Sequence, residues 1–386
     1  MGKKNSINIM DFGMSKIRFS VFDKELNQQY SNIKTVKYDK DYLYHIQEIT
    51  SVIKKAEKKI SMHVKDVVLS LDHENMFTID LSFRRDFDNK IKIAKIYDNL
   101  VLELEQTLNS YYNELEIIHI ILNKCIIDNK TYLDLPKDIK INNIKVDFKV
   151  ICFPKKIINH VRNILNKINV QILNFFCTSY VKSSSYLRKL SLEKASFLDI
   201  GYKRTNFIFY EKKKLILIQS IPIGGMHITK DISEIFKITL DDAEKIKRSF
   251  NKSETEFSYK GDKNEKNFTV NEILKRNISI NQLKQVILYR VQEIIDVSFK
   301  RSNIQKYEIE LKNSDLFFIG NGSLLLNNNS FYLTDKFEFK TLNFYDEKDD
   351  QICGSILVHY INNNELPKRI NKKQGLFEKF FYFFSK

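Results

Sequence analysis

The residues best suited to chemistry lie in a strand–turn–strand near the start of the chain. Asp11 ends an apolar strand, Gly13 and Met14 form the turn, and Ser15 and Lys16 begin the next strand. Glycine adopts positive φ without steric cost, which permits a tight reversal. The turn N–H groups, hydroxyl and ammonium suit phosphate oxygens, and the carboxylate suits Mg²⁺ or its water shell. The alternative is an exposed hairpin with ordinary turn residues.

A second copy of this pattern follows about 190 residues later, where Asp199 ends an apolar strand and precedes Gly201. Two copies at this spacing predict a duplicated domain with a nucleotide held between its halves. Paired Asp-x-Gly hairpins resemble the phosphate clamps of the actin, Hsp70 and sugar-kinase superfamily.

Two further glycine turns follow strands of the second half. Gly224 and Gly225 open a helix, whose free N–H groups and dipole suit a phosphate, although an ordinary helix start is the alternative. The strand 316–319 runs into Gly320-Asn321-Gly322-Ser323. Glycines there would let the backbone lie flat against an adenine ring.

Hydrophobic periodicity predicts the order βββαβ in the first half, with the helix over 41–60, as in an actin-type half-domain. Residues 83–163 interrupt this order with a strand–helix module, at a point where actin has no large subdomain. We therefore expect an α/β fold of two actin-like (ribonuclease H-like) lobes with a nucleotide cleft between them, a small inserted α+β subdomain and a C-terminal amphipathic helix.

The expected limits are as follows: 1–82 and 164–194, with part of 345–362, for the first lobe; 83–163 for the insert; 195–229 and 307–344 for the second lobe; 230–306 for a helical subdomain; 361–374 for a linker; and 375–386 for the amphipathic helix.

The composition limits which partners, cysteine chemistry and membrane segments we expect. The net charge of +15 is spread over every segment rather than gathered in a patch, so we expect no nucleic-acid partner. The four cysteines form no Cys-x-x-Cys pair, which favours reduced core thiols over disulfides or zinc. The sequence has no signal peptide and no apolar run long enough to span a bilayer.

The last twelve residues follow a basic, polar linker and are rich in phenylalanine. At 100° per residue an apolar set fills an arc of roughly 160° on a helix, with Lys379 outside it. This pattern predicts a helix in the membrane interface with lysines near anionic headgroups; the alternative is a tail packed on its own sheet. The predicted membrane-binding residues are Leu376, Phe377, Lys379, Phe380, Phe381, Phe383 and Phe384.

The whole chain resembles the FtsA family of bacterial cell-division proteins. The order of hairpin, insert, second hairpin, helical subdomain, glycine turn, linker and tail is that of the family. The stretches that carry the resemblance are 11–16, 199–201, 221–225, 242–247 and 320–323.

The resemblance implies ATP and Mg²⁺ in the cleft, with Glu244 and Lys247 added to the nucleotide site and Asp11 acting on the metal indirectly. It also implies actin-like filaments, the C-terminal peptide of FtsZ as a partner of the helical subdomain, and contacts with other division proteins. The tail would tether the FtsZ ring to the cytoplasmic face of the inner membrane at the division site. The predicted nucleotide-binding residues are Asp11, Gly13, Met14, Ser15, Lys16, Asp199, Gly201, Lys203, Gly224, Gly225, Glu244, Lys247, Gly320, Asn321, Gly322 and Ser323.

One departure from the family concerns the second hairpin, which usually continues with glycines. Tyr202, Lys203 and Arg204 stand there instead, so side chains crowd the backbone approach while two of them supply charge. We expect nucleotide binding with slow ATP hydrolysis at most, and no catalytic residue is assigned. The alternatives are a PilM-like pilus-assembly scaffold and a small-molecule kinase of the same superfamily.

Overall fold

The computed structural model describes residues 6–36, 46–73, 75–136, 139–249, 278–300, 304, 306–326, 339–345 and 347–362. The predicted amphipathic helix, nearly all of the linker and the polar loop at 251–268 lie outside the described residues.

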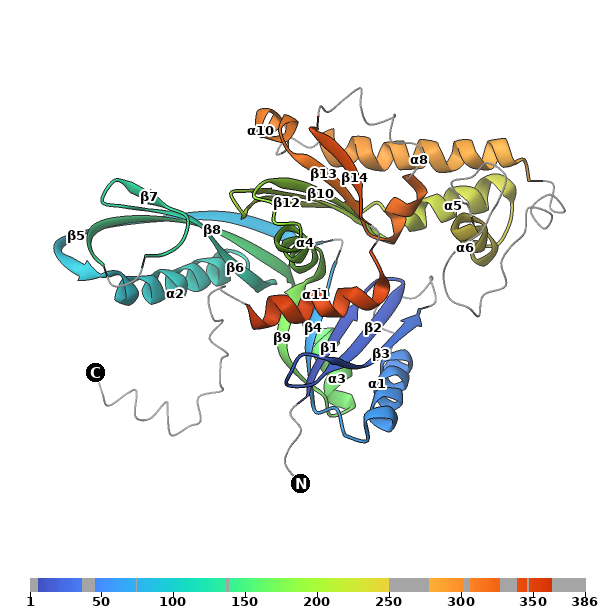
Figure 1. Ribbon diagram of the computed structural model, residues 1–386, viewed down its shortest axis with the longest axis horizontal. Helices are drawn as coiled ribbons and strands as arrows, with labels where there is room; N and C mark the ends of the chain where they lie inside the picture. The colour runs from blue at the N-terminus through green and yellow to red at the C-terminus, as the bar shows by residue number, and fades with distance from the viewer. Residues whose placement is uncertain are drawn as a thin grey trace.

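Two five-stranded sheets form the two lobes, and they share one topology (Figure 1). The first has the order β3-β2-β1-β4-β9 and the second β12-β11-β10-β13-β14. In each sheet the first three strands are antiparallel and the last two run parallel to the first. The duplicated α/β fold predicted from the paired hairpins is therefore confirmed.

The strands of the first sheet are β1 (Ile7–Phe12), β2 (Lys16–Phe22), β3 (Gln28–Thr35), β4 (Asp66–Leu71) and β9 (Gln171–Cys177). Those of the second are β10 (Ala195–Ile200), β11 (Thr205–Glu211), β12 (Lys214–Ile221), β13 (Asp315–Ile319) and β14 (Thr341–Phe344). The central strands β1 and β10 are buried along nearly their whole length, as apolar strands covered on both faces must be.

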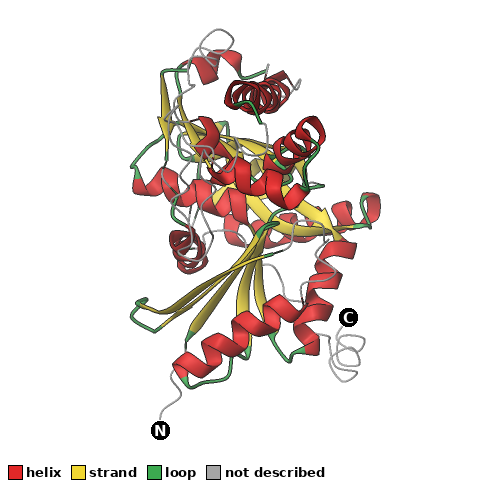
Figure 2. Ribbon diagram, turned by 90° about the vertical axis from the view of Figure 1, so that its right-hand side faces the viewer, coloured by secondary structure: helices red, strands yellow, loops and turns green. Residues whose placement is uncertain are grey.

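Helices cover the faces of these sheets (Figure 2). The first lobe carries α1 (Ile46–Ile60), α3 (Lys155–Lys167) and α11 (Asp349–Ile361). The second carries α5 (Gly225–Phe236), α6 (Leu240–Ser249), α8 (Ile280–Lys300) and α10 (Glu308–Lys312). Between the lobes lies α4 (Thr178–Lys189), which contacts β9, β10 and β11 and packs against α11.

The insert is a four-stranded antiparallel sheet, β5-β8-β6-β7, with one helix (Figure 1). Its elements are β5 (Phe77–Lys92), α2 (Ile93–Tyr111), β6 (Leu115–Ile127), β7 (Lys130–Tyr132) and β8 (Lys140–Pro154). It has a hydrophobic core of its own, whereas α3, which we placed in the insert, buries Ile158, Val161 and Leu165 in the core of the first lobe.

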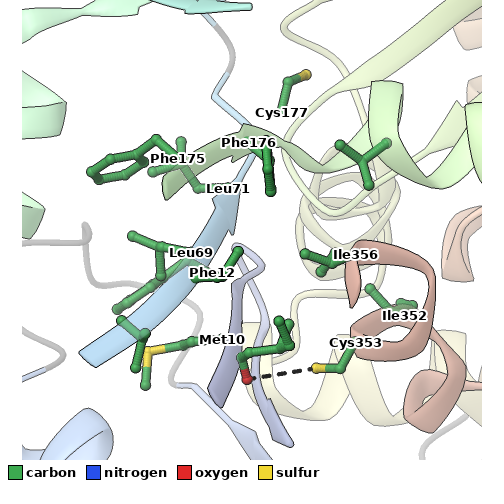
Figure 3. Packing of buried hydrophobic residues seen from close by; sticks show 14 of the residues in the cluster. Met10, Phe12, Leu69, Leu71, Phe175, Phe176, Cys177, Ile352, Cys353 and Ile356 are labelled. Carbon is green, nitrogen blue, oxygen red and sulfur yellow. Dashed lines mark hydrogen bonds between the residues drawn. The ribbon is translucent and has the colours of Figure 1, made fainter. Parts of the chain in front are cut away.

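The largest hydrophobic core spans both lobes. It joins β1 and β4 of the first sheet to Phe197 and Tyr210 of the second. Figure 3 shows α11 against this core, where the Cys353 thiol points toward the backbone carbonyl oxygen of Ile9 at 4.0 Å. A second core fills the space between the second sheet and α5, α6 and α8. No helix among the described residues is long and apolar enough to cross a membrane.

Candidate functional site

The first hairpin, β1–β2, holds Asp11 in a network of donors. Its carboxylate is 1% exposed. Arg18 lies directly across the strand pair and donates from Nη1 to Oδ2 at 2.7 Å. The hydroxyls of Ser70 and Thr178 both donate to Oδ1 at 2.8 Å. The β1–β4 register places Ser70 beside Asp11, so backbone pairing alone positions two of the three donors.

The start of α11 supplies a second carboxylate to this hairpin. The Asp349 carboxylate accepts from Nε of Arg18 at 2.8 Å and pairs with the Lys16 ammonium. Burial favours the neutral acid, but Arg18 and Lys16 outweigh it and lower the pKa of Asp349 to about 2. Burial disfavours the charge of Arg18, but Asp11 and Asp349 outweigh it, so its pKa is raised.

The second hairpin, β10–β11, satisfies its aspartate differently. Asn206, not an arginine, lies across the strand pair from Asp199. The cation comes from α4, where Lys182 Nζ lies 3.1 Å from Asp199 Oδ1 and 3.0 Å from Glu347 Oε2. Burial raises the pKa of Asp199 despite the opposing effect of Lys182. Burial acts against the ammonium of Lys182, but the two carboxylates outweigh it and raise its pKa.

A third buried pair crosses directly from one lobe to the other. Arg204 of the second hairpin pairs through Nη2 with Asp72, which follows β4 of the first lobe. The Ser179 backbone N–H donates to the same carboxylate at 3.0 Å. The Ser179 hydroxyl in turn accepts from Nδ2 of Asn206 at 2.6 Å. Ser179 of α4 therefore links Asp72 of the first lobe to Asn206 of the second.

The N-terminus of α5 packs against the backbone of the second hairpin. The N–H of Gly225 donates to the carbonyl of Gly201 at 2.9 Å, and that of Met226 to the carbonyl of Tyr202 at 2.7 Å. A Cβ at Gly224 would lie 2.6 Å from the Gly201 carbonyl oxygen. Glycine is required at position 224 because two stretches of backbone meet there. The N–H groups of Gly225 and Met226 already have acceptors within the chain.

The predicted pair on α6 also has internal partners. The Lys247 ammonium donates to the Gly225 carbonyl at 2.8 Å and to Glu244 Oε2 at 2.6 Å. Arg248 Nε donates to the other oxygen of Glu244 at 2.9 Å. Burial favours the neutral form of Glu244, but these two cations outweigh it and lower its pKa.

The glycine turn after β13 packs on the end of β10. Gly320 has φ +81°, and a Cβ there would lie 2.4 Å from Asp199 Oδ1. A Cβ at Gly322 would lie 2.8 Å from the carbonyl oxygen of Ile200. The Ser323 hydroxyl donates to the Gly320 carbonyl at 2.7 Å. The turn is thus held tightly beside the second aspartate.

A Mg²⁺ ion does not fit at Asp11. Three donors already use its carboxylate, which offers about four acceptor positions. The Arg18 guanidinium lies where a second cation would be repelled, and Mg²⁺ demands near-ideal octahedral oxygen ligands. Among the described residues, no group of three or more His, Cys, Asp or Glu side chains is placed to hold a metal. These contacts oppose direct coordination, and the indirect role of Asp11 through the water shell of a metal stays a prediction.

The predicted residues gather around the ends of the central strands. Gly13, Met14 and Ser15 form the half-exposed turn of the first hairpin. Gly201, Gly224, Gly225 and Lys247 form one cluster around the second, and Gly320 and Gly322 lie against the end of β10. Whether these groups bind a nucleotide stays a prediction.

Sequence reasoning missed the partners of the two aspartates. Arg18 carried a signal, because it is the only charged residue in the interior of the apolar strand 17–22. Lys182 lies among small polar residues, and Asp72, Glu347 and Asp349 lie in segments with no local pattern that marks them.

These observations define a two-lobed protein with an actin-type duplicated fold. Among solved structures, a protein of the PilM–PilN type IV pilus biogenesis complex matches with a TM-score of 0.61 and 12% identity. That match covers 91% of this chain and 96% of the other, and at this identity it bears on the fold alone.

The family model described as cell division protein FtsA matches residues 196–338. The FtsA of Staphylococcus epidermidis (strain RP62A) is 29% identical over 251 residues, which are 62% of this chain and 54% of the relative. The FtsA of Bacillus subtilis (strain 168) is 21% identical over 257 residues, which are 65% of this chain and 57% of the relative. The chain thus spans little more than half the length of the curated relatives it matches. These matches show that the chain is similar to FtsA proteins over part of its length.

Proposed function

We propose that the protein is an actin-fold scaffold of bacterial cell division, which assembles into filaments and tethers an FtsZ ring to the membrane through its C-terminal segment. The observation that carries the proposal is the coincidence of two independent findings. The FtsA family model matches residues 196–338, and the same stretch contributes four of the five strands of the second sheet of the duplicated fold.

The partner surface in this proposal is the helical subdomain, residues 230–306. Of this segment the structure describes α5, α6 and α8, which share one core with the second sheet. Arg290 of α8 pairs with Asp231 of α5 at 2.6 Å, so the two helices form one unit. A rigid helical face is a suitable platform for a short peptide such as the C-terminus of FtsZ.

Membrane attachment would reside in residues 375–386. Six apolar side chains on one arc give up to about 1.5–3 kcal/mol each on burial, before the cost of ordering the segment. A single tail would therefore bind weakly and reversibly. A filament would bind strongly, because each further tail then inserts from a high effective concentration. The site of action would be the cytoplasmic face of the inner membrane at the division site.

An adenine nucleotide near Gly320–Ser323 stays a prediction, and the proposed scaffold does not depend on its hydrolysis. No catalytic base is assigned, and no step is routed through a metal ion.

The decisive test replaces Phe380 and Phe381 with Glu in the full chain. We expect pelleting with anionic liposomes to be lost while binding of an FtsZ C-terminal peptide, followed by fluorescence anisotropy, is retained. The matched control places the same two negative charges on the polar arc, as Tyr382→Glu with Ser385→Glu, and should keep most of the pelleting. Equal pelleting by wild type and the Phe variant would refute the membrane role.

The second candidate is a scaffold that binds a partner's peptide without a membrane tail, as in pilus assembly. Such a scaffold would share the fold that this chain has in common with a protein of the PilM–PilN complex over 91% of its length. This candidate predicts no binding of the FtsZ peptide and no effect of the Phe380 and Phe381 changes on any interaction.

A further inference from the structure

The interlobe ion-pair network consists of Arg204 with Asp72 and of Lys182 with Asp199 and Glu347. All five side chains are less than 9% exposed. The first pair joins the second hairpin directly to the first lobe, and the second group ties α4 to both the second sheet and the segment before α11. Every charge in the network therefore has an opposite charge within the chain.

The network lies beside the two hairpins where the sequence predicts a nucleotide and its metal. At Asp11 the Arg18 guanidinium supplies the positive charge that a divalent metal would supply. At the second hairpin the carbonyls of Gly201 and Tyr202 accept the first N–H groups of α5. A metal ion and a phosphate would each have to displace a formed contact rather than complete an unfinished one.

The energetics favour a persistent closed arrangement. Breaking a buried ion pair by removing one partner leaves an uncompensated charge and is strongly destabilising. Separation of the lobes would carry Arg204 away from Asp72 and would also uncover the apolar core that the two lobes share. Both effects oppose opening in the absence of any ligand.

We propose that the two lobes are held closed by this internal network, and that closure needs neither Mg²⁺ nor a nucleotide. Arg18 takes the role of the divalent cation at the first aspartate, and Arg204 with Lys182 takes the role of the bridging ligand. Assembly and tethering, the functions proposed above, would then proceed in the closed state without a nucleotide cycle.

The test measures interlobe distance by fluorescence transfer in the full chain. Dyes are attached at Lys55→Cys on α1 and Asp241→Cys on α6, two exposed positions on the two lobes. The four native cysteines are buried, which directs labelling to the introduced thiols. We expect the same transfer efficiency in EDTA and in millimolar Mg²⁺ with ATP.

In the same labelled chain, Arg204→Gln should lower the transfer efficiency, and it should lower the melting temperature by several degrees. Adding Mg²⁺ with ATP should not restore the transfer efficiency of this variant. Adding Asp72→Asn removes the orphaned charge and should recover a large part of both signals. Arg188→Gln is the matched control, since it removes a guanidinium from an exposed position of α4 and should change neither.

Two results would overturn the proposal. One is a wild-type chain that is open in EDTA and closes with Mg²⁺ and ATP. The other is an Arg204→Gln variant as closed and as stable as Arg188→Gln. Liposome pelleting and peptide binding are separate readouts, so a failure of closure is distinguishable from a failure of the proposed function.

Discussion

The two hairpins have the same backbone but satisfy their aspartates in different ways. In the first, the cross-strand position holds Arg18 and the neighbouring parallel strand offers the hydroxyl of Ser70. In the second, the corresponding positions hold Asn206 and Ile319, neither of which supplies a cation. Asp199 therefore depends on Lys182, which comes from the helix between the lobes.

The two aspartates differ in whether the paired cation comes from the same hairpin or from another part of the fold. The first aspartate obtains its cation from its own hairpin. The second obtains its cation only when α4 is packed in place. Neutralisation of the second aspartate is therefore coupled to the packing of α4, whereas the first aspartate receives only a hydroxyl from that helix.

The largest effect should come from Lys182→Met. It leaves Asp199 and Glu347 buried without their shared cation, and we expect a loss of about 3–5 kcal/mol in the free energy of unfolding. Arg18→Asn, which converts the first hairpin to the pattern of the second, should cost less, because Ser70 and Thr178 still donate to Asp11. Urea denaturation measures both.

The control for this comparison is Lys189→Met, at the exposed end of the same helix. It should change the free energy of unfolding by less than about 1 kcal/mol. If Lys182→Met were no worse than Arg18→Asn, the second aspartate would not depend on the interlobe helix.

The next effect concerns the glycine turn that closes over Asp199. Gly320→Ala forces a Cβ to within 2.4 Å of Asp199 Oδ1 at a φ of +81°, and we expect it to cost about 2–4 kcal/mol. Gly354→Ala in α11 is the matched control, since nothing lies within 4 Å of its Cβ, and it should stabilise the helix by up to about 1 kcal/mol. Thermal unfolding of the two variants distinguishes the steric clash at position 320 from the general effect of replacing a glycine by alanine. Equal melting temperatures would contradict this account.

The smallest effect is a difference in acid sensitivity. The folded-state pKa of Asp349, about 2, lies below the ordinary value of 3.8. The ionised Asp349 carboxylate therefore adds to the free energy of unfolding above pH 3.8, and this stabilisation is lost as the pH falls toward 2. That contribution is on the order of 2 kcal/mol. Asp199 has a raised pKa, so its effect has the opposite sign, and stability declines as the pH rises through its folded-state value.

The measurement is the free energy of unfolding as a function of pH for wild type, Asp349→Asn and Asp199→Asn. Asp349→Asn should flatten the rise of stability between pH 2 and 4, and Asp199→Asn should remove a decline of stability above pH 3.8. Slopes of the same sign for the two aspartates would contradict the comparison.

The sequence by itself determined the duplicated strands. Each apolar run that ends in Asp-x-Gly lies within a short continuous stretch, so it can be recognised without knowing which distant residues it contacts. It also predicted α5, the helix that Gly224 and Gly225 open. It did not predict β14, a short edge strand of only four residues.

Only the tertiary structure decided what the charged residues do. Arg204 meets Asp72 across 132 positions of sequence, and Arg18 meets Asp349 across 331. No local pattern encodes such a pairing, because it arises where two lobes and a helix from the end of the chain converge. The same convergence pairs Lys16, which sequence reasoning gave to a phosphate, with the Asp349 carboxylate of α11.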